Sequence, residues 1–324
     1  MQEKRRRIFG VFIVLCVIML TGCKGGKNQT DTAKYSIVCT TFAQYDWIRE
    51  ITAGHSDSFE LIYLLDKGGD LHSYQPTAES MAKIASADMF VYVGGESDAW
   101  VEEALKGAVN KDMRVVNLMD SLGDRVREEE LVEGMQCYED DAPGETEYDE
   151  HIWLSLKNAS YLTKVLSETL QGLDAENAQD YAANAGNYIE AIEALDREYA
   201  DMVKQSVKKT VLFGDRFPFR YMTEDYGLDY YAAFSGCSTE TDASFETITF
   251  LAGKTDELGL SAILAIEGSD QRIAEIIRQN TQDQNQEILT MNSLQSVTAE
   301  EIENGFTYLG AMRDNLAVLK NALN

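Results

Sequence analysis

Apolar and polar positions follow two periods along the chain, one typical of β-strands and the other of α-helices. Eight short apolar runs predict strands, at 36–40, 59–65, 89–93, 114–118, 210–214, 229–233, 261–267 and 287–291. Helical spacing separates these runs, at 43–51, 77–85, from about 97, at 151–170, 217–225, 244–258, 270–280 and 298–323. Strands that alternate with helices are typical of parallel βαβ units. The pattern therefore predicts an α/β protein in which two such series follow one another.

The longest helical pattern covers residues 174–207 and lies between the two series. Its apolar side chains recur every three or four residues and form one stripe, made of Tyr181, Ala185, Tyr188, Ile192, Leu195, Tyr199 and Met202. About 34 residues of helix are roughly 50 Å long, which is more than one small lobe needs. We therefore predict an N-terminal α/β lobe at 35–173, a rigid linker helix at 174–207 and a C-terminal α/β lobe at 208–324.

The N-terminal segment has the pattern of an export signal. Basic residues at 4–7 precede an apolar run at 8–20, and small residues follow before Cys23. That run is too short to span the ~30 Å hydrocarbon core of a bilayer comfortably. Its end, Leu20-Thr21-Gly22-Cys23, resembles the lipobox of bacterial lipoproteins, which implies cleavage of residues 1–22 and lipidation of Cys23. An ordinary signal peptide or anchor with an incidental cysteine is the alternative.

The residues after this cysteine extend the same interpretation. Residues 24–34 are polar and contain glycine, so we expect 23–34 to be a lipidated, flexible tether. Later stretches of the sequence are neither long nor apolar enough to cross a bilayer. The location expected is therefore the extracytoplasmic face of the cell membrane, to which the lipid attaches the protein.

The net negative charge of the chain limits which kinds of partner it can bind. The chain has 28 basic and 55 acidic residues, a formal net charge of −27. Such a surface repels nucleic acid and anionic lipid but not a cation. Eleven of the acidic residues fall at 128–150, a segment without lysine or arginine. We expect a solvated acidic loop there, which either concentrates cations or is a plain linker.

Cysteines carry less information. Cys39, Cys137 and Cys237 follow Cys23, and three cysteines are no disulfide framework, although one pair could form outside the cell. The sequence does not select the pair. The chain has no CxxC motif, which argues against a zinc site built from thiolates.

Polar residues with ligand chemistry follow several of the predicted strands. His72 comes after the run 59–65, Asp215 directly after 210–214, Glu267 ends 261–267, and Asn292 follows 287–291. Ligands of open α/β sheets bind at the carboxyl ends of strands. A second histidine, His151, follows the acidic loop. Two imidazoles with one or two oxygen ligands suit Zn²⁺, and also Mn²⁺ or Fe²⁺.

Four segments together resemble the zinc and manganese solute-binding lipoproteins of ABC transporters, with the zinc branch more similar: LHSYQPTA (71–78), EHIWLSLKNA (150–159), FGDRFPFRYMTEDYGL (213–228) and TYLGAMRDNLAVLKNAL (307–323). The resemblance implies two similar lobes joined by one long helix, with a single metal between them. It implies that His72 and His151 are ligands. Asp215 stands where a histidine is common, and Asn292 where an aspartate is common. The fourth ligand is then water, Asn292 or Glu267.

The function implied is capture of a divalent metal, most simply zinc, and delivery to an ABC permease and its ATPase by a monomeric carrier that is not an enzyme. Affinity should fall below about pH 6, where histidine protonates. Manganese binding by the same fold, and a second role as an adhesin, are alternatives.

Two enzymatic alternatives use other features of the chain. An extracellular metallohydrolase would need a general base beside an open metal position, and no HExxH motif occurs. Gly95-Glu96-Ser97-Asp98-Ala99 loosely resembles a nucleophile elbow but lacks its last glycine. Helix capping by Ser97 or Asp98 is the simpler interpretation, and it predicts that Ser97→Ala leaves function unchanged.

Overall fold

The computed structural model describes residues 35–135, 147–238 and 242–324. Residues Lys34–Asn324 form one compact unit. The expected leader at 1–22, Cys23, the tether at 23–34 and Cys137 all lie outside the described residues. Each of the eight predicted strands is present: β1 Tyr35–Cys39, β2 Phe59–Tyr63, β3 Met89–Tyr92, β4 Arg114–Asn117, β5 Thr210–Phe217, β6 Asp229–Ser235, β7 Ala262–Ile266 and β8 Glu287–Met291.

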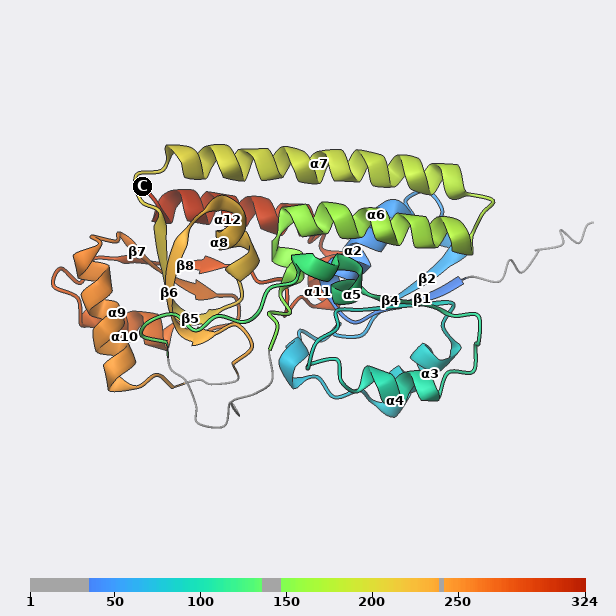
Figure 1. Ribbon diagram of the computed structural model, residues 1–324, viewed down its shortest axis with the longest axis horizontal. Helices are drawn as coiled ribbons and strands as arrows, with labels where there is room; N and C mark the ends of the chain where they lie inside the picture. The colour runs from blue at the N-terminus through green and yellow to red at the C-terminus, as the bar shows by residue number, and fades with distance from the viewer. Residues whose placement is uncertain (1–34, 136–146, 239–241) are drawn as a thin grey trace, which may run out of the picture. The chain divides into compact units, whose positions relative to one another are not determined.

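The strands form two four-stranded sheets with the same topology. Their orders are β2-β1-β3-β4 and β6-β5-β7-β8, and every pairing is parallel. In both sheets the first strand of the series lies inside and the second at an edge, so the chain reverses its direction of travel across the sheet at the first strand. This confirms the predicted fold class of two similar βα lobes (Figure 1).

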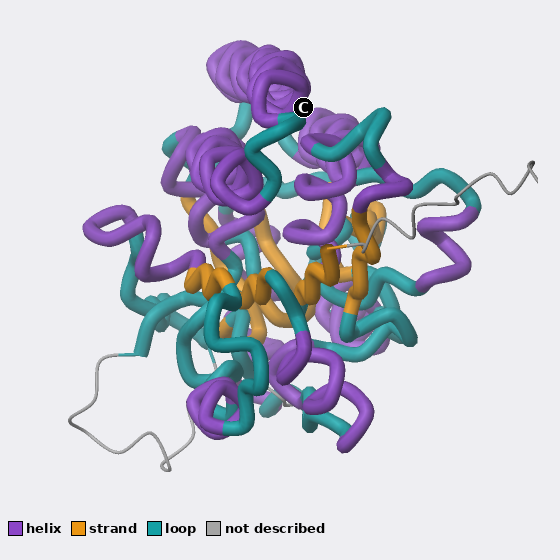
Figure 2. The backbone as a smooth tube through the Cα atoms, turned by 90° about the vertical axis from the view of Figure 1, so that its right-hand side faces the viewer, coloured by secondary structure: helices purple, strands orange, loops and turns teal. Residues whose placement is uncertain are grey.

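Helices cover both faces of these sheets (Figure 2). They are α2 Phe42–Ile51, α3 Ala78–Ser86, α4 Val101–Lys106, α5 Leu118–Leu122, α6 Leu156–Leu173, α7 Ala178–Gln205, α8 Arg220–Tyr226, α9 Phe245–Glu257, α10 Arg272–Gln279, α11 Ala299–Glu303 and α12 Tyr308–Ala322. Parallel strands buried on both faces explain the continuous apolar runs in the sequence.

Helix α7, which lies in the segment predicted to be the linker, contacts helices of both lobes (Figure 1). Near its start, Asn184 donates to the carbonyls of Ile51 and Ala53. Near its end, the Tyr199 hydroxyl donates to the Met312 carbonyl. The helix has 28 residues, about 42 Å at 1.5 Å per residue. It is shorter than predicted at its N-terminus because α6 ends at Leu173 and a turn separates the two helices.

One apolar core extends through both lobes on the α7 side. It includes Trp47 and Trp153 from the first lobe, Phe213 from the second and Tyr308 from α12, all 0–1% exposed. The Tyr308 amide donates to the buried Asp46 carboxylate at 2.8 Å. Because close-packed interiors resist deformation, this shared core favours a fixed arrangement of the lobes.

The C-terminal helical pattern at 298–323 is two helices, not one. Gly305 has φ +91°, a conformation that favours glycine, and it ends α11. Thr307 then starts α12 by accepting the Gly310 amide at 3.0 Å. A short helix that the sequence pattern did not predict, α5, follows β4 directly, and Asn117 caps it.

Glycine allows one close contact near the predicted site. A Cβ on Gly214 would lie 2.5 Å from the Ala274 Cα, so β5 and α10 approach this closely only with glycine there. The next residue along β5 is Asp215. The contact therefore sets the position of that carboxylate relative to α10.

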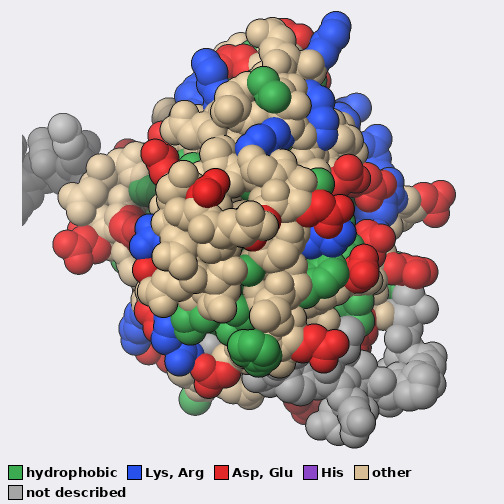
Figure 3. Space-filling model, turned by 90° about the vertical axis from the view of Figure 1, so that its left-hand side faces the viewer, with side chains coloured by type: hydrophobic (Ala, Val, Ile, Leu, Met, Phe, Trp, Pro, Cys, Tyr) green, Lys and Arg blue, Asp and Glu red, His purple; other side chains and the backbone are tan. Residues whose placement is uncertain are grey.

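No helix within the described residues combines the length and apolarity required to cross a membrane. On the face of the C-terminal lobe shown in Figure 3, acidic side chains are spread over the surface and basic ones are interspersed among them.

Candidate metal site

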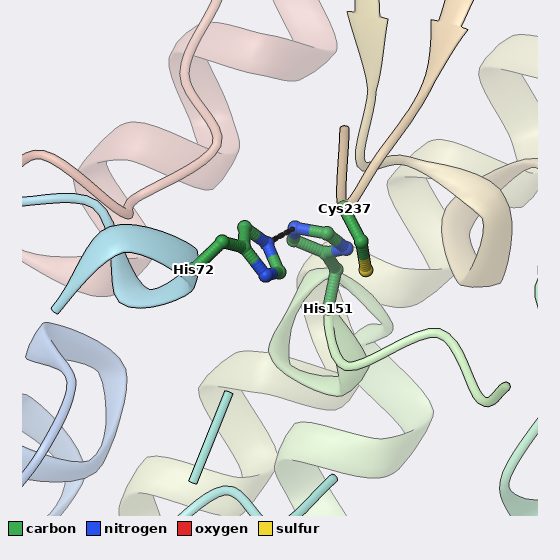
Figure 4. Close-up of side chains that lie close together, drawn as sticks. All are labelled: His72, His151 and Cys237. Atoms are coloured by element: carbon green, nitrogen blue, oxygen red, sulfur yellow. Dashed lines mark hydrogen bonds between the residues drawn. The ribbon is translucent and has the colours of Figure 1, made fainter. Parts of the chain in front are cut away.

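Two predicted ligands, His72 and His151, meet in the structure (Figure 4). His72 lies in a short 3-10 helix, Leu71–Ser73, after β2, and His151 immediately precedes another, Ile152–Leu154, before α6. Their Nε2 atoms are 3.1 Å apart. His151 is fully buried, and only 5% of the His72 side chain is exposed. Residues separated by 79 positions thus place two ring nitrogens at one point.

The other ring nitrogen of each histidine is also occupied. His151 Nδ1 lies 2.9 Å from Asp149 Oδ1, which accepts the His151 amide as well. His72 Nδ1 lies 2.8 Å from Ser97 Oγ and 3.4 Å from Glu150 Oε2. A carboxylate accepts only, so Asp149 holds a proton on Nδ1 of His151 and leaves Nε2 as the nitrogen available to a metal. This is the usual outer shell of a histidine that binds a metal.

The pKa values of the two histidines move in opposite directions. Burial, followed by the charge of His151, lowers the pKa of His72. Burial alone would lower the pKa of His151 too, but the charge and hydrogen bond of Asp149 outweigh it and raise that pKa. When the metal-free pair carries one added proton, these directions favour its presence on His151 over His72. A metal must displace that proton in order to bind both Nε2 atoms.

The ends of the acidic loop hold His151 in position. Glu128 and Tyr148 form an antiparallel bridge, and the Asp149 amide donates to the Arg127 carbonyl at 2.9 Å. The Tyr221 hydroxyl donates to the Asp149 carbonyl. The described ends of the segment are thus packed against the second lobe, unlike the solvated loop that we predicted. Residues 136–146 lie outside the described part.

An ion pair between the lobes holds the His72 turn. Asp70 accepts the His72 amide at 3.0 Å and pairs with Arg216 of β5 at 2.7 Å. Burial would raise the pKa of Asp70, but the charge of Arg216 and the hydrogen bonds from Arg216 and the His72 amide lower it instead. The charged pair therefore links the turn after β2 to the first strand of the other lobe.

Asp215 and Glu267 line the same cavity as His72, which has a volume of about 520 Å³. The Asp215 carboxylate accepts the amides of Arg216 at 2.8 Å and Ile266 at 3.3 Å. Glu267 binds Ser293 through both oxygens, at 2.6 and 2.7 Å. Burial raises the pKa of Glu267, against the hydrogen bonds from Ser293. Neither carboxylate belongs to the group of ligand atoms around His72 and His151.

Asn292 directs its side chain into its own loop. Its Oδ1 accepts the Leu294 amide at 2.8 Å, and its backbone exchanges two hydrogen bonds with the Asn315 amide group. The nearby Gln295 is 4% exposed, and neither polar atom of its side chain has a hydrogen-bond partner among the described residues. A buried amide in that state is costly, which marks this loop as unusual.

Cys237 joins the two histidines. One ring nitrogen of each histidine and the Cys237 Sγ all lie within 4.8 Å of one another (Figure 4). Among the described residues, these three side chains form the group of His, Cys, Asp or Glu side chains that lie close enough together to share one metal ion. Burial raises the pKa of the Cys237 thiol, and the charge of Glu129 raises it further. Cys237 and Cys39 are both free thiols.

Comparison with known proteins shows the family of the chain. Residues 37–322 match the family described as "Zinc-uptake complex component A periplasmic". The chain belongs to this family. Members are, by that description, components of a zinc-uptake complex, which is a transport role.

Relatives are similar along nearly all of this chain. The "Zinc-binding lipoprotein AdcA" of Streptococcus pneumoniae is 30% identical over 313 residues, which are 94% of this chain and 59% of that protein. The chain therefore spans about three fifths of the length of this relative. The "High-affinity zinc uptake system protein ZnuA" of Bacillus subtilis is 24% identical, with 97% of each protein covered.

A solved structure agrees with the fold of this chain. The Zn(II)-bound ZnuA-like domain of Streptococcus pneumoniae AdcA has a TM-score of 0.70 and 25% sequence identity, with coverage of 90% of this chain and 99% of that one. The resemblance that we inferred from the four segments is confirmed at the level of the family.

Sequence reasoning missed several residues of the site. Ser97 and Asp98 do not cap α4, whose N-cap residue is Trp100. Ser97 instead contacts His72, and Asp98 turns back to accept the amides of Val93 and Gly94. The capping interpretation was therefore wrong, and Ser97→Ala removes a contact of a candidate ligand. No sequence spacing signals this contact, because Ser97 and His72 belong to different βα units.

Glycine positions this Ser97 loop. Gly95 has φ +81°, and a Cβ there would lie 2.3 Å from Glu150 Oε1. The Glu150 carboxylate, whose pKa burial raises, accepts the Ser97 amide at 2.9 Å. The turn after β3 and the residue before His151 thus fit together only without a side chain at 95.

Asp98→Asn is expected to stabilise the metal-free protein at alkaline pH. Burial, opposed by the Gly94 amide, raises the pKa of Asp98 to about 7. The native state then binds more protons than the unfolded state between about pH 4 and 7, so the contribution of Asp98 to stability falls as pH rises through this window. The full difference is about 4 kcal/mol at most. Asparagine keeps an oxygen for both amides but cannot ionise.

Urea unfolding of both proteins from pH 4 to 8 measures this effect. The difference between their free energies of unfolding should be small at pH 4 and should grow toward pH 8. Because both proteins share all other titrating groups, the contributions of those groups cancel in this difference. Parallel stability curves would show that Asp98 ionises normally in the folded protein.

Proposed function

We propose that this chain is the extracytoplasmic zinc-binding component of an ABC importer. It captures Zn²⁺ and passes it to a permease driven by an ATPase. The observation that carries the proposal is the pair of facing Nε2 atoms of His72 and His151, 3.1 Å apart.

The distance fits a shared metal. Two nitrogens bound to one tetrahedral zinc at 2.0–2.1 Å lie about 3.3 Å apart, close to the separation found. Two neutral imidazoles that face each other through lone pairs repel, so the arrangement needs a proton or a cation between them. Asp149 and Ser97 hold the rings in this orientation through their contacts with the Nδ1 atoms of His151 and His72.

Asp215 is the oxygen ligand that we propose from the second lobe. It lines the cavity that His72 also lines, and its position is set by two backbone amides. Glu267 binds Ser293 through both oxygens, and Asn292 Oδ1 accepts the Leu294 amide. The oxygens of Asp215 accept hydrogen bonds too, so we rank Asp215 first because the family resemblance puts a ligand at that position.

The choice of zinc over manganese rests on ligand type. Imidazole suits zinc, whereas carboxylate, carbonyl and water suit manganese. The nitrogen pair at the centre of the site therefore favours zinc, in agreement with the names of relatives such as the zinc-binding lipoprotein of Streptococcus pneumoniae. Manganese carriage and a second adhesive role remain alternatives that stand on the sequence alone.

The export pattern supplies the location. Cleavage before Cys23 and its lipidation would attach a monomer to the extracytoplasmic face of the membrane, with 23–34 as the tether and the lobes divided at 35–173, 174–207 and 208–324. That the chain catalyses no reaction also stays a prediction. Transport by a carrier requires only binding and release of the metal. The proposed site would provide the binding.

Titration of the metal-free, full-length protein with Zn²⁺ and separately with Mn²⁺ by calorimetry tests the proposal. We expect one-to-one binding with zinc tighter than manganese. Affinity should decline as pH falls through the raised pKa of His151, hence from above the ordinary histidine value of about 6.5. Manganese as the tighter ligand would replace zinc in the proposal, and binding of neither metal would overturn it.

A further inference from the structure

Cys237 reaches the histidine pair from the second lobe. It lies in the turn that follows β6, and its side chain is beside His151 in Figure 4. The turn comes this close because the preceding residue is glycine. A Cβ on Gly236 would lie 2.9 Å from both His151 Cε1 and the Phe217 carbonyl oxygen. The backbone is therefore adapted to bring position 237 against the imidazole.

The distances suit a sulfur ligand after a small movement. For tetrahedral zinc, with Zn–S near 2.3 Å and Zn–N near 2.05 Å, nitrogen and sulfur ligands lie about 3.6 Å apart. The Cys237 Sγ and one nitrogen of each histidine are all within 4.8 Å of one another. The sulfur therefore has to approach each nitrogen by at most about 1.2 Å, which rotation about the Cα–Cβ bond can supply.

We propose that the Cys237 thiolate is a ligand of the transported metal, so that His72, His151 and Cys237 form a nitrogen–sulfur site with Asp215 as the oxygen ligand. This inference rests on the proposed function, because it adds a ligand to the same site. The absence of a CxxC motif argued against thiolates, but that argument concerns ligands that are neighbours in sequence. Here the ligands come from three separate turns.

The chemistry of the proposed ligand is consistent with its surroundings. The thiol releases its proton to solvent as the sulfur binds the metal, since a coordinating thiol is deprotonated outright. The Cys237 amide lies 3.5 Å from the Glu129 carboxylate, at the described end of the acidic loop. The loop, the β6 turn and both histidine turns therefore meet at one site.

A thiolate ligand would also determine selectivity. Soft sulfur ligands bind zinc and disfavour manganese, which prefers oxygen. Cys237→Ser replaces the sulfur by a harder hydroxyl of similar shape. We expect zinc affinity to fall by about 10²-fold, comparable to the loss of one ligand, and manganese affinity to change by less than about 3-fold.

Cobalt(II) is the probe that distinguishes ligation from proximity. The purified full-length protein, stripped of metal, is loaded with one equivalent of Co²⁺, and its near-ultraviolet spectrum is compared with that of Cys237→Ser. A sulfur-to-cobalt charge-transfer band in the wild type that disappears in Cys237→Ser, and persists in Cys137→Ala and Cys39→Ala, supports the proposal.

The outcomes separate the two proposals. One-to-one cobalt binding without the charge-transfer band, or with a band that survives Cys237→Ser, overturns the thiolate ligand and leaves the metal carrier intact. Failure of the wild type to bind cobalt, zinc or manganese overturns both. Cys237→Ala checks that any loss in the serine variant comes from the absent sulfur and not from the hydroxyl.

Discussion

Replacing His151 by alanine is expected to weaken zinc binding by about 10²–10³-fold. Zinc sites of four protein ligands are worth about 10–16 kcal/mol at neutral pH, so one ligand supplies about 2.5–4 kcal/mol. His151 is fully buried, and its Nε2 lies 3.1 Å from that of His72, so no exposed side chain can take its place. Calorimetric titration of metal-free wild-type and variant proteins with Zn²⁺ measures the change.

His55 supplies the matched control. It contacts the exposed Asp180 at 2.8 Å through Nε2 and belongs to the loop before β2. His55→Ala should leave zinc affinity within about 2-fold of the wild type, since it removes an imidazole that is no part of the site. An affinity of His151→Ala within 3-fold of that control would contradict the assignment of His151 as a ligand.

Trp153→Ala is expected to lower the free energy of unfolding of the metal-free protein by about 3–5 kcal/mol, the range for large aromatic residues in a core. The side chain is 1% exposed, and its indole N–H donates to the Ser293 carbonyl at 2.8 Å. The Trp153 carbonyl in turn accepts the Tyr308 hydroxyl at 2.6 Å. The residue therefore joins the turn that carries His151 to two segments of the C-terminal lobe.

Urea unfolding followed by circular dichroism measures this loss. Trp153→Phe keeps most of the packing but removes the indole donor, so it should cost only about 1–2 kcal/mol, the effect of leaving a buried carbonyl without its partner. If both variants lost less than 1 kcal/mol, the core between the lobes would not be the main support of the His151 turn.

The apolar core that both lobes share limits the movements by which the proposed carrier would release its metal. Because α7 and the core around Trp153 and Tyr308 connect both lobes, a large hinge rotation would separate many packed side chains. For the proposed carrier, release then most simply involves the turns that carry His72 and Cys237, with the Asp70–Arg216 ion pair as the contact between the lobes that has to break.

Prediction of the fold from sequence succeeded because its signals are local. Each strand of a parallel sheet is a short apolar run, and each helix repeats its apolar side chains every three or four residues. The errors occurred where a single residue changes the backbone. Gly305 divides the last helix in two, and the turn at Asp174 shortens α7, neither of which alters the periodicity of the flanking residues.

For the candidate site, the sequence predicted less than it did for the fold. Sequence alone determined that His72 and His151 are its first candidates, since histidine is rare in this chain and both lie in segments that resemble one family. Only the tertiary structure decided what surrounds them. Ser97 and Cys237 reach the pair through contacts between elements that are distant in the chain, and a side chain's direction across such a contact depends on how the elements pack. Local pattern therefore determined the elements, and packing decided the chemistry of the site.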